Sequence, residues 1–163
     1  MKPIFENFAY PTDEEVIDAI LSVPEHFADL AITAANVVPG VGAQTQTGIA
    51  GETITAGQPL YIKASDANML WRCDNDADVF TPVCVGIAAV GGSRGQKILY
   101  YTTGSINLGA TLVVGETYVV SGNVGMIAPV GDLSPADSLT YLGYATTTAL
   151  ITLNILPTGV LHG

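Results

Sequence analysis

The sequence predicts a mainly β protein, a β-barrel or β-sandwich, with a short helical arm at its N-terminus. Short runs of β-favouring residues recur from residue 36 onward, and glycine, proline, asparagine and aspartate separate them. A helical pattern is confined to the first 35 residues. The 163 residues suffice for one domain with a small appendage. We therefore expect an arm at residues 1–35 and a β domain at residues 36–163.

The arm is acidic and contains the start signal of a helix. It carries seven of the fifteen acidic residues of the chain. Thr12-Asp13-Glu14-Glu15 has the form of a capping box, in which the first and last side chains satisfy free amides at a helix N-terminus. An apolar stripe from Val16 to Leu21 follows, and Pro24 stops or bends the helix.

Apolar and aromatic residues precede this helix without a periodic pattern. Two interpretations stay open for them: packing on the core of the same chain, or insertion into a neighbouring subunit. Aromatic side chains are favoured anchors at interfaces. Together with the first β segment, residues 37–47, they supply the candidate contacts with other subunits: Ile4, Phe5, Phe8, Tyr10, Val37, Val38 and Val41.

The β region contains clear strand candidates and an internal repeat. The strand candidates are residues 60–62, 97–102, 117–120 and 149–156. The repeat is the form Gly-x-Thr-(Ile/Leu)-x-x-Gly, which begins at Gly51 and again 58 residues later at Gly109. Two further matches lie at nearly the same offset: residues 85–88 with 142–145, and more weakly 68–70 with 125–127.

The repeat predicts two related units of about 58 residues, residues 47–104 and 105–157. Each repeated segment is a strand, a turn and a second strand, which is too small to bury its own apolar face. We therefore expect the two units to pack around a shared core. The second glycine of each copy, Gly57 or Gly115, permits a positive φ in the tight connection before the next strand.

The charge composition disfavours several partners. The net charge is −10, and the chain has only five basic residues. Binding to nucleic acid, or to an anionic membrane surface, needs clustered cations, so we expect neither partner. Charged residues make up 12% of the chain, against about 25% in an average domain. Another subunit is therefore expected to cover part of the surface.

The sequence also lacks membrane and export signals. No run approaches the roughly 18 consecutive apolar residues of a membrane span, and the first residues lack the apolar core of a secretory signal. We expect synthesis in a cytoplasm. In a reducing compartment Cys73 and Cys84 are expected to be free thiols, although their spacing also permits a bridge.

Enzyme and cofactor signatures are absent from the sequence. The two histidines, His26 and His162, lie near opposite ends of the chain. Residues 91–97 resemble a phosphate loop only superficially, because a strand follows them, and we expect a hairpin loop. Residues 74–78 alternate oxygen ligands but lack the glycine and bidentate acid of a calcium loop, so we expect a solvated acidic loop. We expect no enzyme activity, no metal and no cofactor.

Residues 51–62, 85–88 and 104–112 together resemble the capsid decoration, or cement, proteins of tailed bacteriophages. The resemblance covers about residues 45–156. It implies a virion protein made in the host cytoplasm that binds the outside of the phage head, commonly as a homotrimer. The implied partner is the major capsid protein, whose subunit contacts it would stabilise.

Two other functions stay open. The first is a head-fibre, tail-associated or host-binding virion module, in which exposed aromatic residues such as Trp71, Tyr100 and Tyr101 would bind a glycan or receptor. The second is a small β-barrel enzyme or metal-binding domain, which would need a convergent polar pocket.

Overall fold

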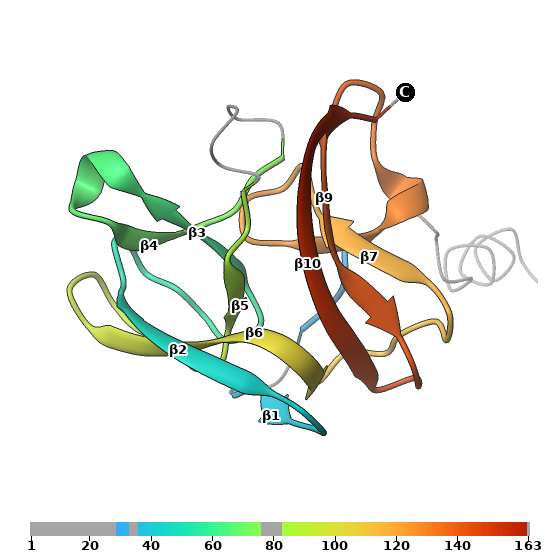
Figure 1. The fold of residues 1–163 in the computed structure, drawn as a ribbon, viewed down its shortest axis with the longest axis horizontal. Helices are drawn as coiled ribbons and strands as arrows, with labels where there is room; N and C mark the ends of the chain where they lie inside the picture. The colour runs from blue at the N-terminus through green and yellow to red at the C-terminus, as the bar shows by residue number, and fades with distance from the viewer. Residues whose placement is uncertain (1–28, 33–35, 76–82, 163) are drawn as a thin grey trace, which may run out of the picture.

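The protein is mainly β, as the sequence predicts. The computed structural model describes residues 29–32, 36–75 and 83–162, and strands account for 51% of the residues that can be interpreted. These ranges contain no α-helix, and none of them forms a helix long and apolar enough to cross a lipid bilayer. The helix expected between residues 12 and 24 lies outside the described residues. Figure 1 shows the strands as one strongly curled sheet, a half-barrel.

Ten strands and two single-turn 3₁₀ helices make up the fold. The strands are β1 (Val38–Pro39), β2 (Gln44–Ile49), β3 (Pro59–Lys63), β4 (Met69–Arg72), β5 (Gly86–Ala88), β6 (Lys97–Asn107), β7 (Thr117–Val120), β8 (Ile127–Pro129), β9 (Ser138–Ala145) and β10 (Leu150–Leu161). The 3₁₀ helices are η2 (Ala64–Asp66) and η3 (Val130–Asp132). All strand pairs are antiparallel, in the order β4-β3-β5-β6-β10-β9-β7-β8, and β1 and β2 pair with β6.

The four strand candidates of the sequence are confirmed, as are both turn glycines. The candidates correspond to β3, β6, β7 and β10, of which β6 and β10 extend further than the pattern indicated. Gly57 and Gly115 have φ values of +85° and +83°, so each connection uses the conformation that favours glycine. Residues 91–97 join the antiparallel strands β5 and β6, as expected for a hairpin loop.

The two halves of the sheet, taken as β3 to β6 and β7 to β10, have the same internal order: in each half the second strand along the chain lies at the outer end, followed by the first, the third and the fourth. From one end, β4 pairs with β3, then β5, then β6. From the other end, β8 pairs with β7, then β9, then β10. β6 and β10 meet at the centre. β6 continues through residues 104 and 105, so the boundary expected there between two units falls inside a strand.

A small core lies inside the first half of the sheet. A bridge between Ala50 and Leu70, supported by a 2.8 Å hydrogen bond from the Gly51 amide to the Leu70 carbonyl, joins the end of β2 to β4. The strands β2, β6, β5, β3 and β4 therefore curl around a compact group of buried side chains: Ala50, Ile54, Leu60, Leu70, Ala88, Ile98 and Tyr100.

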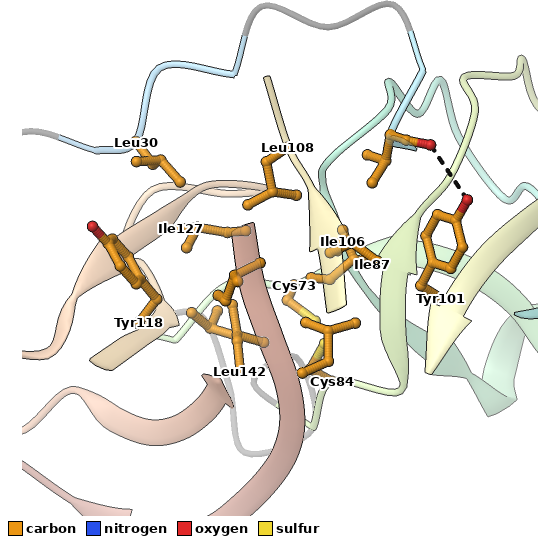
Figure 2. Packing of buried hydrophobic residues seen from close by; sticks show 14 of the residues in the cluster. Leu30, Cys73, Cys84, Ile87, Tyr101, Ile106, Leu108, Tyr118, Ile127 and Leu142 are labelled. Carbon is orange, nitrogen blue, oxygen red and sulfur yellow. Dashed lines mark hydrogen bonds between the residues drawn. The ribbon is translucent and has the colours of Figure 1, made fainter. Parts of the chain in front are cut away.

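A larger core lies on the opposite side of these strands and continues into the second half of the sheet. Tyr61 and Ile87 alternate along their strands with residues of the small core, so their side chains point to the opposite side, into the larger core. Figure 2 shows Ile87 and Ile106 from the first half in one cluster with Ile127 and Leu142 from the second half, and Leu30 beside it. The two halves therefore share this core, which fixes their relative position.

Candidate interaction surface

Apart from Lys97 at the first position of β6, eight of the ten described strands contain no Asp, Glu, Lys or Arg. Three of these eight, β5, β7 and β8, are mostly buried. The other five, β1, β2, β6, β9 and β10, lie beside one another, and we call their solvent-facing side the uncharged face. Proteins usually place charges on exposed sheets and sheet edges to prevent association. The uncharged face is therefore a candidate interaction surface.

Cross-strand pairing makes the uncharged face continuous. Directly paired residues of antiparallel strands project to the same side of the sheet, so each register gives a row of side chains. Ser105 and Thr152 join two strands within one such row through a 2.9 Å hydrogen bond between their hydroxyls. The rows are Ser105-Thr152-Tyr144, Gln44-Thr103-Asn154 and Val38-Asn107-Leu150.

Exposed apolar side chains lie on these strands and on the turn between β1 and β2. A hollow of about 260 Å³ lies between Tyr141, Tyr144 and Leu156, and Leu156 is 55% exposed. The exposed apolar residues of this region are Val38, Val41, Ile49, Leu99, Tyr144, Leu156, Val160 and Leu161. Aliphatic and aromatic groups among neutral polar ones have the composition of an interface centre, where charge is depleted.

The edge of this face is an accessible strand. β2 pairs with β6, and within the described residues no strand pairs with its other edge before the bridge at Ala50. All six residues of β2 are exposed or half-buried. The strand reads Gln-Thr-Gln-Thr-Gly-Ile and lacks the lysines or prolines that commonly protect edges. It is therefore open to pairing with a strand from another chain.

The structure describes three of the seven contact residues expected from the sequence. Val38 is 57% exposed and Val41 is 90% exposed, and both flank the end of β6 at the turn between β1 and β2. Val37 is only 4% exposed and belongs to the larger core, which corrects its expected place on the surface. The other four lie outside the described residues: Ile4, Phe5, Phe8 and Tyr10.

The aromatic residues suggested for glycan binding do not present free faces. Tyr100 and Tyr101 lie in β6, where they are 4% and 6% exposed, so their expected place in exposed loops is wrong. Trp71 is half-buried in β4. The Lys63 ammonium lies 4.0 Å from the centre of the Trp71 ring, and the indole nitrogen donates a 3.0 Å hydrogen bond to Asp66.

Ion pairs tie the loops around Trp71 together. Arg94 donates two 2.9 Å hydrogen bonds to the Asp66 carboxylate and a further one to the Gly51 carbonyl. These bonds hold the pKa of Asp66 below its usual value of 3.8. Arg72 forms a second ion pair with Glu52, which also accepts the Arg72 amide at 2.8 Å. Each arginine is paired with a carboxylate, so these ion pairs hold the loops in place.

The cysteines are free thiols in the larger core. Cys73 is fully buried and Cys84 nearly so, and Figure 2 shows their sulfur atoms close together. Burial raises the pKa of the Cys73 thiol well above its usual value, and the neighbouring Cys84 adds to this effect. The Cys73 thiol is therefore a poor nucleophile in the folded chain.

The acidic loop after β4 is partly described, and the described part is structural. Asn75 is buried, and its side-chain amide donates a 2.8 Å hydrogen bond to the Val120 carbonyl. Across the described ranges, no group of three His, Cys, Asp or Glu side chains is placed to hold a metal ion. Residues 76–78, which complete the predicted loop, lie outside those ranges.

The described chain begins beside a second, polar hollow at the η3 end of the sheet. Asp29 accepts hydrogen bonds from the Ser121 hydroxyl and, at 2.7 Å, from the Asn123 side-chain amide. Asp132 and Asp137 also line this hollow of about 260 Å³. The contacts of Asp29 fix the point from which residues 1–28 continue.

Comparison with known proteins gives no further assignment. A scan against models of protein families finds no match, and a search of curated protein sequences finds none either. The function must therefore be argued from the surface described above.

Proposed function

We propose that the protein is a structural, non-enzymatic virion subunit that binds the outside of a phage capsid and braces its major capsid protein. The continuous uncharged face supports the protein-binding part of this proposal. The virion part is supported by the resemblance of residues 51–62, 85–88 and 104–112 to capsid decoration proteins. No cofactor, nucleic acid or membrane takes part in this function.

The proposed mechanism is contact area distributed over several neighbours. A stable protein interface buries about 800 Å² on each partner. A homotrimer with contacts to several capsid subunits holds through many such contacts, and separating two capsid subunits must break several at once. The uncharged strands would pack against neighbouring subunits of the shell. The N-terminal segment around Phe5 and Phe8, with Val38 and Val41, would contact the capsid.

We further propose that the β domain is a duplication of one four-strand unit, preceded by the helical arm. The matching strand orders support the duplication, as does a pair of equivalent hydrogen bonds. The Gly57 amide bonds the Ala88 carbonyl at 2.8 Å, and the Gly115 amide bonds the Ala145 carbonyl at the same distance. These donors and acceptors differ in number by 58 and 57 residues, which are the offsets of the sequence repeat.

Binding to purified expanded phage shells tests the proposed function. The variant Thr103→Lys with Asn154→Glu introduces two charges that are paired across β6 and β10, so the net charge of the chain stays at −10. Opposite charges at paired positions leave the sheet stable, but they would have to be desolvated in an interface. We expect wild-type protein to bind shells at fixed stoichiometry and raise their melting temperature, and the variant to lose both effects.

Thr111→Lys with Thr148→Glu is the matched control, because both residues are exposed and lie outside the five strands of the uncharged face. We expect this control to bind shells like wild type. Deleting residues 1–11 should weaken binding while the β domain keeps its melting temperature. Wild-type protein that binds host cells and ignores shells would replace the capsid proposal with a host-binding function.

A further inference from the structure

Three of the four basic residues of the described chain lie around Trp71 and at the start of β6. All four fall between residues 63 and 97, and no Lys or Arg follows them in the sequence. We call this group of three the basic corner: Lys63, Arg94 and Lys97, with the carboxylate of Asp66. Three cations and one carboxylate leave a formal charge of +2 in a chain whose net charge is −10. Arg72 is paired with Glu52 and packs against Gly125, away from this corner.

Contacts between neighbouring loops hold the basic corner together. The Lys63 ammonium lies 4.0 Å from the centre of the Trp71 ring, and the Arg94 guanidinium lies 5.8 Å from it. Lys97 lies at the start of β6, opposite Ile49 of β2, and is exposed. Arg94 and Arg72 have carboxylate partners, whereas the ammonium groups of Lys63 and Lys97 form no ion pair with another described residue. The corner therefore presents two cations that can receive an anionic partner.

The opposite end of the molecule is acidic. Residues 98–163 contain three acidic residues and no basic one. Residues 1–28 contain six acidic residues and one lysine, a formal charge of −5, and four of the acids fall between Asp13 and Asp18. Figure 1 places the β3–β4 hairpin and η3 at opposite ends of the long axis. Asp29, at which the described chain begins, is anchored near η3, at the end far from the basic corner.

We propose that the acidic segment Asp13–Asp18 of one copy binds the basic corner of a second copy. The contact is head to tail, because it joins different surfaces of two identical chains. Such contacts close into rings when the rotation between copies permits it. The occupant is a second copy because Asp29, to which the acidic segment connects, is held at the opposite end of its own sheet. The inference rests on the proposed function only for the expectation that the chain self-associates.

The proposed contact is electrostatic and therefore sensitive to salt. The cations are near the surface, where the attraction between charges is screened over a length of about 10 Å at 0.1 M salt and over a shorter length as the salt concentration rises. Full-length protein should therefore form oligomers at low salt and dissociate between about 0.05 and 0.5 M sodium chloride. Interactions confined to the uncharged face would show the opposite trend or none, because neutral and apolar contacts are not screened.

Matched variants test the basic corner by analytical ultracentrifugation. Lys63→Gln with Lys97→Gln lowers the net charge by two without touching either arginine ion pair. Thr111→Glu with Thr148→Glu lowers it equally at exposed positions outside the corner. We expect the first variant to weaken self-association by roughly three- to tenfold, the range for two exposed charge pairs, and the control to change it by less than about twofold. Equal effects in the two variants would overturn the proposal.

A charge exchange tests whether two copies are involved. Glu14→Lys with Glu15→Lys, and separately Lys63→Glu with Lys97→Glu, should each fail to self-associate in full-length protein. Mixing the two should restore an oligomer that contains both chains, because each supplies the surface that the other lacks. A mixture that stays dissociated, or wild-type protein that is monomeric at low salt, would overturn the proposal.

The shell-binding variants separate this inference from the proposed function. Thr103→Lys with Asn154→Glu alters the uncharged face and leaves the basic corner intact. If it loses shell binding but keeps salt-sensitive self-association, both proposals are supported. If the charge exchange fails while wild-type protein still binds shells, only the head-to-tail contact is wrong.

Discussion

Gly104 lies where β6 passes the turn between β1 and β2, and alanine at this position should destabilise the fold in two ways. Its φ is +87°, a conformation that residues with a side chain rarely adopt. A Cβ would also overlap the carbonyl group of Gly42 and the backbone nitrogen of Ala43, at separations below the 3.0 Å that real Cβ contacts respect. The backbone strain costs about 1–3 kcal/mol, and displacing the turn adds about 1–3 kcal/mol. We expect Gly104→Ala to lower the free energy of unfolding by about 2–6 kcal/mol.

Two other glycines separate the two effects. Gly115 has φ +83°, and no other atom lies within 4 Å of the position that a Cβ would take, so Gly115→Ala should show the backbone strain alone. Gly131 has open space and no positive φ, so Gly131→Ala should change stability by less than about 1 kcal/mol. Urea denaturation followed by circular dichroism measures all three. Equal losses in Gly104→Ala and Gly115→Ala would refute the close approach of the turn to β6.

Three further predictions concern single side chains. Tyr118→Phe removes the hydroxyl that accepts the Val113 amide at 3.0 Å, so we expect urea denaturation to show a loss of about 1–2 kcal/mol. Hydrogen bonds from Arg94 lower the pKa of Asp66, so its ionised form stabilises the fold above pH 3.8 and this contribution is lost as the pH falls through the lowered pKa. Asp66→Asn should therefore reduce the dependence of the melting temperature on pH on the acid side. Burial raises the pKa of Cys73, so iodoacetamide at about pH 8 should alkylate it only after denaturation, and labelling of native protein at the rate of an exposed thiol would contradict its position.

The local amino-acid sequence was sufficient to predict several strands and turns. Residues 117–120 combine β-branched and aromatic side chains, and they form β7 with the predicted bounds. The positive φ of Gly57 and Gly115 followed from the need for glycine in a tight connection. Pairing partners could not be derived in the same way, because the partners of β6 are distant in the sequence and no local preference selects among them.

The two adjacent tyrosines of β6 show why burial was harder to predict. Alternation would place Tyr100 and Tyr101 on opposite faces, with one exposed to solvent. Both are buried because Tyr100 belongs to the small core and Tyr101 to the larger core on the other side. At these two residues β6 lies between two cores and has no solvent side, and only the arrangement of the neighbouring strands reveals this.

The candidate surface was only partly predictable. The sequence shows long segments without charge, and Val38 and Val41 were expected on a contact surface, where the structure leaves them exposed. That the uncharged segments become neighbouring strands depends on long-range pairing. The prediction that Val37 lies on the surface was wrong, because alternate residues of an edge segment point inward. The local sequence does not show which of Val37 and Val38 faces the core.

The central position of β10 has a consequence for synthesis on the ribosome. β10 is the last of the described strands to leave the exit tunnel, yet it joins β6 to β9 at the middle of the sheet. Until it emerges, the two halves of the sheet lack the strand that connects them and each exposes an unpaired edge. At about 5–20 residues per second, the nascent chain spends several seconds in this incomplete state. The sheet can therefore close only after β10 has emerged.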